Sequence, residues 1–195
     1  MNVRSMVILR LLLGLWVSLT TSTTVLGEET PVFEIERAEF QLDGSLLILE
    51  ARIQIELPKY IEMAVDQGFA VPMSFEVEIL QDRKYWFDQK IVSLKQQYLF
   101  HFLPMLDVYV ITDINRGSRD YFDSREQAVR SLQQISQYSM FDIGNINANL
   151  KVYARMRFGL DSDELPLPLK SSSFWANDWD LHSEWFSWNL DRVKR

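Results

Sequence analysis

Alternation of apolar and polar residues in three segments constrains the fold of this chain more than any other feature. Apolar side chains occupy every second position in residues 47–57, 75–79 and 146–158, with mostly charged or amide side chains between them. A period of two is that of a β-strand with one buried and one wet face, since a helix repeats its apolar positions every three or four residues. Such strands are typical of antiparallel sheets, so the chain is predicted to be mainly β.

Turn residues separate further strands. Asp43-Gly44 tolerates the positive φ angles of a two-residue type I′ turn, so residues 32–57 are predicted to form a β-hairpin. Pro104 removes a donor from the ladder and is predicted to separate two strands. The further strands are expected at 84–94, 97–103 and 105–112.

Two segments have helical spacing instead. Pro58 suits a first helical position and Gly68 suits the left-handed residue after a helix end, so a helix is predicted between them. Ser124 and Gln127 can form a capping box that begins a second helix. Short antiparallel strands with two inserted helices predict an immunoglobulin-like β-sandwich, in which the apolar faces of two sheets cover each other. The side chains expected in its core are Leu49, Ile53, Ile55, Phe75, Val77, Leu150, Val152 and Trp185.

The N-terminal residues are typical of an export signal. Arg4 and Arg10 supply positive charge, and residues 11–26 form an apolar stretch without a charged side chain. Cleavage before Glu28 would make residues 1–27 a signal peptide and 28–195 a single domain. The alternative is an uncleaved N-terminal anchor. In both cases the protein is expected in the periplasm or on the periplasmic face of the inner membrane.

Charge and composition restrict the partners. Loss of residues 1–27 removes two arginines and no acid, so the net charge changes from −7 to −9. Nucleic acid is not an expected partner, because phosphate binding needs a basic face, and an anionic membrane surface would repel the chain as well. Membrane contact is expected only through an uncleaved N-terminal segment. The chain has no cysteine, so burial rather than disulfides has to stabilise it.

Catalytic and metal-binding groups are scarce. The only histidines are His101 and His182, and neither a glycine-rich phosphate loop nor a nucleophile motif occurs. Two histidines cannot complete a three-ligand catalytic zinc site without an acid. The carboxylates of residues 161–164 are of the kind that bind calcium from a loop, but their spacing does not match an EF-hand loop. No catalytic residue, cofactor or metal is therefore expected.

Three aromatic residues in succession, Tyr85, Trp86 and Phe87, lie on a predicted strand. Side chains alternate between the two faces of a strand, so at least one ring is expected on the less buried face. Tyrosine and tryptophan are favoured at protein interfaces, because they combine a large contact area with a polar group. This run is therefore a candidate for part of a binding surface, unless other elements cover it.

Four tryptophans, Trp175, Trp179, Trp185 and Trp188, fall within fourteen positions near the C-terminus. Their spacing fits both a strand and a helix, and a strand is favoured because aromatic residues and intervening serines suit a pleated surface. On a strand, Trp179 and Trp185 are expected to point inward and Trp188, with Phe186, outward. The candidate binding surface then consists of Tyr85, Trp86, Trp175, Phe186 and Trp188.

Short motifs occur along the chain in an order that is more specific than any one of them. They are Arg83-x-Tyr85-Trp86-x-Asp88, Tyr98, Phe122-x-Ser124, Arg155-x-Arg157 ahead of Leu160-Asp161, and Leu165-Pro166-Leu167-Pro168-Leu169 followed by Trp179-x-Leu181-x-Ser183-x-Trp185-x-x-Trp188. With these motifs the sequence resembles a proteobacterial family, domain of unknown function 4390, also labelled proline-rich signal-peptide protein. The resemblance implies a small exported protein with no assigned activity or catalytic residues. Such proteins are often encoded beside a sensor kinase of the nitrogen-regulation type and an rRNA methyltransferase, which is an association rather than a mechanism.

Three hypotheses about function stay open. The first is a non-catalytic module that binds another envelope protein, such as the periplasmic part of a membrane sensor kinase. The second is a glycan- or peptidoglycan-binding module, in which Trp175 and Trp188 stack on sugars while Asp178 and Asp180 accept their hydroxyl protons. The third is an enzyme of unknown type. The lack of catalytic groups, the aromatic surplus and the resemblance favour the first.

Overall fold

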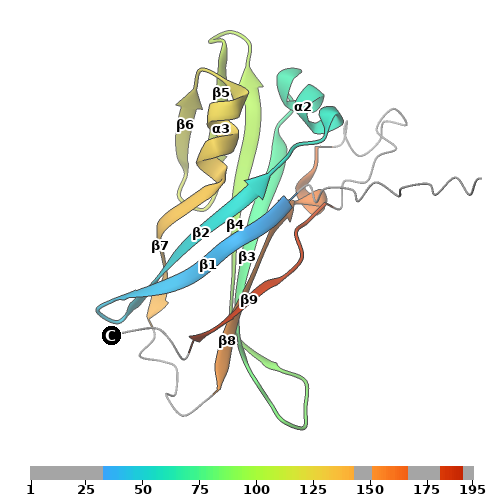
Figure 1. Cartoon of the computed structure of the whole chain (residues 1–195). Helices are drawn as coiled ribbons and strands as arrows, with labels where there is room; N and C mark the ends of the chain where they lie inside the picture. The colour runs from blue at the N-terminus through green and yellow to red at the C-terminus, as the bar shows by residue number, and fades with distance from the viewer. Residues whose placement is uncertain (1–32, 143–150, 167–180, 191–195) are drawn as a thin grey trace, which may run out of the picture. The chain divides into compact units, whose positions relative to one another are not determined.

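The strands form two antiparallel sheets, one of three strands and one of six (Figure 1). The computed structural model describes residues 33–142, 151–166 and 181–190, which belong to one compact unit, Pro31–Arg195. The predicted mainly β fold with two short inserted helices is confirmed for this part of the chain. Within it, no helix is both long and apolar enough to cross a membrane.

The three-stranded sheet contains the predicted hairpin. Its order is β1 (Phe33–Asp43), β2 (Leu46–Ile55), β7 (Gln134–Asp142). The turn between β1 and β2 lies one residue later than predicted, because Asp43 pairs with Leu46 and leaves Gly44 and Ser45 as the central residues. Gly44 has a φ of 62°, whereas Ser45 does not have a positive φ. A positive φ at the first central residue alone is typical of a type II′ turn rather than the predicted type I′.

The six-stranded sheet is built mainly from one meander. Its order is β6 (Ser118–Phe122), β5 (Val108–Asp113), β4 (Gln89–Leu103), β3 (Val71–Gln81), β8 (Val152–Leu160), β9 (Phe186–Asn189). β4 is one strand of 15 residues, where the sequence predicts two strands, 84–94 and 97–103. It ends at Leu103, which confirms the predicted break at Pro104. An immunoglobulin-like strand order is not confirmed, since four consecutive strands of this sheet form a simple meander.

The first helix, α2 (Lys59–Asp66), carries the chain from β2 to β3. Pro58 precedes the first helical residue instead of occupying it as predicted. Gly68 has the predicted left-handed conformation, with a φ of 84°, and its amide donates to the carbonyl of Val65 at 2.8 Å. This bond satisfies a carbonyl that would otherwise lack a partner at the helix end.

The second helix, α3 (Arg125–Leu132), carries the chain back from β6 to β7. The hydroxyl of Ser124 accepts a hydrogen bond from the amide of Gln127 at 3.3 Å, as the predicted capping motif requires. Ala128 and Leu132 are buried against the sheets. A local residue, Pro58 or Ser124, therefore marks the start of each helix, and burial of an apolar face stabilises each helix.

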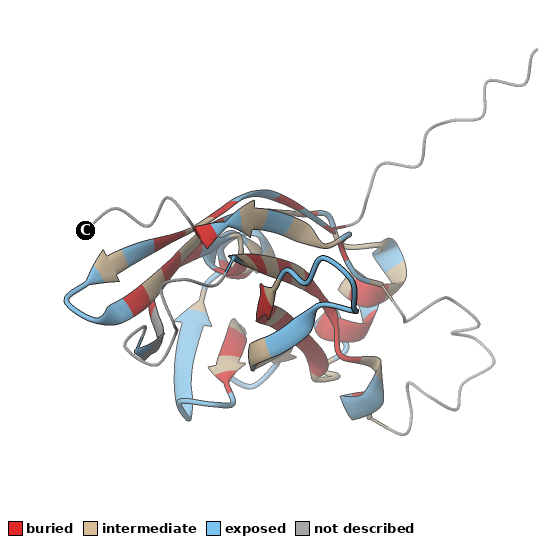
Figure 2. Cartoon of the chain, turned by 90° about the horizontal axis from the view of Figure 1, so that it is seen from below, coloured by how far each residue is buried: buried red, intermediate tan, exposed pale blue. Residues whose placement is uncertain are grey.

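The core lies between the apolar faces of the two sheets, where the buried residues in Figure 2 gather. Ring pairs connect the sheets: Phe33 meets Phe158 and Phe75 meets Tyr138, each with ring centroids 5.4 Å apart. Of the predicted core residues, Leu49, Ile53, Ile55, Phe75 and Val77 are buried there and Val152 packs at the edge. Leu150 lies outside the described residues.

Trp185 is not in the core, and that prediction is wrong. Gly159 forms a bridge with His182, and Met156 pairs with Phe186, so three steps along β8 correspond to four along the C-terminal segment. The extra residue reverses the two faces, because successive side chains of a strand alternate. Phe186 and Trp188 consequently pack against the core, the reverse of the predicted arrangement.

Candidate functional site

The residues between β3 and β4 form an exposed loop, hereafter the aromatic loop, residues 82–88 (Figure 1). The sequence predicts a strand from residue 84, and the structure corrects this. Tyr85, Trp86 and Phe87 are 83%, 79% and 96% exposed, so all three rings face solvent instead of alternating. Three consecutive large rings without cover are unusual on a domain surface, because single exposed apolar residues are the norm.

The base of the aromatic loop is held by hydrogen bonds. One oxygen of Asp88 accepts from the amide of Arg83 at 3.4 Å, and the other accepts from the hydroxyl of Tyr153 at 2.6 Å. The hydrogen bond to Asp88, with some burial, raises the pKa of Tyr153. The amide of Asp82 also donates to the carbonyl of Lys151 at 3.0 Å. The loop is therefore fastened to β8 while its tip is bare.

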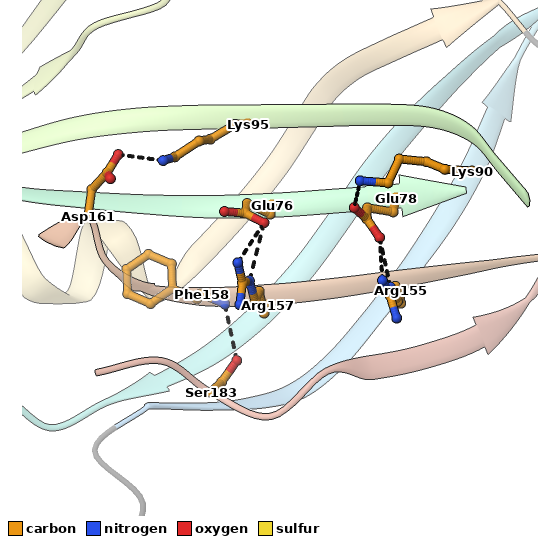
Figure 3. Close-up of polar contacts among 9 residues, drawn as sticks. All are labelled: Glu76, Glu78, Lys90, Lys95, Arg155, Arg157, Phe158, Asp161 and Ser183. Atoms are coloured by element: carbon orange, nitrogen blue, oxygen red, sulfur yellow. Dashed lines mark hydrogen bonds and ion pairs between the residues drawn. The ribbon is translucent and has the colours of Figure 1, made fainter. Parts of the chain in front are cut away.

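Tyr153 begins a row of polar side chains that runs along the face of the large sheet opposite the core, hereafter the outer face. Arg155 and Arg157 of β8 reach to Glu78 and Glu76 of the neighbouring β3 (Figure 3). Arg157 places Nε and Nη2 at 3.2 and 3.0 Å from one oxygen of Glu76. Opposite charges on adjacent strands stabilise their pairing.

Glu78 is a buried charge of the outer face, at 4% exposure. Arg155 donates to it from Nε at 2.8 Å and from Nη2 at 2.7 Å, and Lys90 of β4 forms a second ion pair. Burial by itself favours the protonated carboxyl, but the hydrogen bonds from Lys90 and Arg155 outweigh it and lower the pKa of Glu78. The ion pairs of Glu78 thus link β4, β3 and β8.

Asp161, the first residue of the candidate calcium loop at residues 161–164, binds other side chains of the protein. Asp161 is buried, and its carboxylate accepts from Lys95 and from the side-chain amide of Gln97, both at 2.8 Å. The ammonium group of Lys95 therefore occupies the position that a metal ion would take at this carboxylate. Among residues 33–142, 151–166 and 181–190, no three histidine, aspartate or glutamate side chains are placed to hold a metal ion.

Trp185 lies over the arginine row on the outer face. Its ring centroid is 4.3 Å from Cζ of Arg155 and 4.8 Å from Cζ of Arg157. Guanidinium groups at this distance are attracted to the face of an indole ring. Because each of these arginines also has a carboxylate partner, the outer face is internally compensated and offers no strong field to a charged ligand.

The predicted binding surface is divided by the structure. Tyr85 and Trp86 lie in the exposed loop, whereas Phe186 and Trp188 are half-buried against the core, with Trp188 5.3 Å from the ring of Phe40. Trp175 lies outside the described residues, as do Asp178 and Asp180 of the glycan hypothesis. Trp188, the fourth member of that sugar site, faces the core.

Neither exposed Phe87 nor half-buried Trp185 is part of the predicted surface. Phe87 is the most exposed ring of the loop, and its place beside Tyr85 and Trp86 was the available signal. Alternation predicts Trp185 in the core, because the one-residue shift between His182 and Phe186 has no counterpart in the sequence pattern.

Comparison with known proteins identifies one family. The family model described as Domain of unknown function (DUF4390) matches residues 30–189. The matched stretch includes the aromatic loop, the outer face and β9. No curated protein and no solved structure matches the chain.

Proposed function

The chain belongs to the DUF4390 family, and from the exposed aromatic loop we propose that it is a non-catalytic, exported module that binds another envelope protein. Tyr85, Trp86 and Phe87 provide the contact. Their exposure, between 79% and 96%, is the observation that carries the proposal. Buried aromatic anchors dominate the binding energy of most protein interfaces.

The loop is suited to this role because its base is already ordered. Asp88 joins the amide of Arg83 to the hydroxyl of Tyr153, so less conformational entropy is lost when a partner covers the tip. Preorganisation of this kind raises affinity by lowering the cost of binding. Arg83 and Lys84 are exposed beside the rings, which favours a partner with carboxylates around an apolar pocket.

The affinity expected from the aromatic loop alone is low. Covering three rings of ~150–250 Å² each at ~25 cal/mol per Å² contributes on the order of 10 kcal/mol. Association itself costs ~4–15 kcal/mol. The aromatic loop alone therefore supports a weak or transient complex, and tighter binding requires further contacts along the neighbouring outer face.

The sequence supports the proposed location, and the proposed partner rests on the family resemblance. The apolar segment at residues 11–26 supports export to the periplasm or to the periplasmic face of the inner membrane. The partner we propose is an envelope protein, with the periplasmic region of a membrane sensor kinase as the first candidate.

Photo-crosslinking in intact cells tests the proposal. A photoreactive amino acid replacing Phe87 should give a discrete adduct with one envelope protein. The same group replacing Met105, which is 98% exposed beyond the other end of β4, is the matched control and should not. Trp86→Ala should remove the Phe87 adduct without changing thermal unfolding. Identical adducts from both positions, or none from either, would rule out the aromatic loop as the contact.

A further inference from the structure

A second region, far from the aromatic loop, has the character of a ligand site. A cavity of about 180 Å³ lies between the two sheets beneath α3. Tyr98 and Asp113 of the large sheet, Tyr138 of β7 and Ser131 of α3 line it, together with Arg116. Tyr98 is nine residues along β4 from Gln89, which is roughly 30 Å from the aromatic loop. The inference therefore goes beyond the proposed function and does not depend on it.

Two lining residues, Asp113 and Tyr138, belong to a buried polar cluster with Gln96. Gln96 is completely buried and donates from its side-chain amide to Oδ1 of Asp113 at 2.6 Å. The hydroxyl of Tyr138 donates to the carbonyl oxygen of Gln96. Asp113 is itself only 7% exposed. Burying a carboxylate costs several kcal/mol unless it is well paired. Apolar side chains at these positions would therefore give a more stable fold.

Arg116 lies at the mouth of the cavity. Its backbone amide donates to Oδ1 of Asp113 at 2.8 Å, while its Nε lies 3.9 Å from Oδ2, too far for a hydrogen bond. The guanidinium covers the ring of Tyr138 at 4.5 Å and is about half exposed. Arg116 thus balances the charge of Asp113 while leaving Oδ2 able to accept a hydrogen bond from a ligand.

The remaining lining is amphipathic and, apart from Asp120, neutral. Burial raises the pKa of both Tyr98 and Tyr138, so each hydroxyl keeps its proton at neutral pH. Exposed Ser118 and Asp120 are at the rim, so the cavity opens to solvent. Its apolar walls are Ile111, Leu132, Ile135 and Phe158.

The lining defines the ligand. The two carboxylates and one guanidinium of the lining disfavour an anion. A neutral molecule with several hydroxyls could donate to Asp113 Oδ2, bond to the hydroxyls of Tyr98 and Ser131, and place its C–H groups on the apolar walls. The volume corresponds to roughly ten water-sized positions. We propose that this cavity binds a neutral polyhydroxylated molecule of about the size of a monosaccharide.

Titration of the full chain with glucose and N-acetylglucosamine tests this site. Saturable binding by calorimetry is expected, with a Kd in the millimolar range, on the order of 1–10 mM. Gluconate, the carboxylate counterpart of glucose, should bind at least about fivefold more weakly, because Asp113 and Asp120 repel it. No saturation at about 50 mM of either neutral sugar, or tighter binding of gluconate, would overturn the proposal.

Two variants assign the binding to the cavity. Asp113→Asn keeps the shape of the side chain and should weaken binding at least about tenfold. Because it also alters the buried cluster and could unfold the domain, Tyr98→Phe, which removes only a hydroxyl, is the second variant and should weaken binding about threefold or more. Trp86→Ala in the aromatic loop should leave the Kd unchanged. Wild-type affinity in Tyr98→Phe, or a loss in Trp86→Ala, would show that the sugar binds elsewhere.

Discussion

The hydroxyl of Tyr153 donates to Oδ2 of Asp88 at 2.6 Å and joins the outer face of β8 to the base of the aromatic loop. This one bond connects the two surface features of the large sheet. The ordered base of the loop, with its bare aromatic tip, is therefore a property of two segments that are 65 residues apart in sequence.

Tyr153→Phe should loosen the loop without unfolding the domain. The variant loses one exposed hydrogen bond, which is worth about 1 kcal/mol at most. Hydrogen exchange of the amides in residues 82–88 should become faster, while the denaturant midpoint changes little. Tyr121→Phe on the edge strand β6 is the control, because Tyr121 is 56% exposed. If hydrogen exchange is equally fast in both variants, the hydrogen bond from Tyr153 to Asp88 does not order the aromatic loop.

Glu78→Gln should reduce the acid sensitivity of the protein. The pKa of Glu78 is lower in the fold than in the unfolded chain, so its ion pairs stabilise the fold above the unfolded pKa of about 4.3. This contribution is lost as the pH falls through the lower, folded pKa. Urea unfolding between pH 7 and pH 3 should therefore show a smaller loss of stability in the variant than in the wild type. An unchanged pH profile would show that Glu78 is not a source of the acid sensitivity.

Trp188→Ala should destabilise the fold more than Trp185→Ala. Trp188 packs against Phe40 and the core, so its loss should cost about 2–4 kcal/mol, toward the lower part of the range for buried aromatic residues. Trp185 stacks on Arg155 and Arg157 outside the core, so its loss should cost about 1 kcal/mol. Denaturant unfolding measures both. The opposite ranking would restore the inward Trp185 that simple alternation predicts.

Ile53→Ala and Gln54→Ala, neighbours on β2, should differ strongly. Ile53 is 1% exposed between the sheets, so its truncation should cost ~2–5 kcal/mol through lost burial and a cavity. Gln54 lies on the opposite face and bonds to Glu56 at the surface, so its truncation should shift the free energy of unfolding by less than about 0.5 kcal/mol. If both cost the same, the register of β2 is wrong.

Much of the local structure and most of the core residues could be predicted from the sequence. Alternation located β2, β3 and β8 and selected Ile53 and Phe75 as inward residues, because the period of two belongs to a single strand whatever it pairs with. The ends of α2 and α3 were predictable for the same reason. Gly68 and Ser124 act through bonds to residues in the same helix turn.

Which aromatic residues are exposed and which polar residues meet depends on the tertiary structure. Gly159 lies within β8, and a Cβ there would come within 2.4 Å of the carbonyl oxygen of Leu181. The C-terminal segment therefore passes close to β8 at this point. Between His182 and Phe186 it contains one residue more than β8 does, and this extra residue turns Trp185 outward. Likewise, Gln96 of β4 bonds to Asp113 of β5 and to Tyr138 of β7. The sequence around each of these residues does not indicate that they meet. Exposure and polar pairing depend on what packs opposite a side chain, and that is set by register and sheet contacts between distant segments, which local periodicity does not contain.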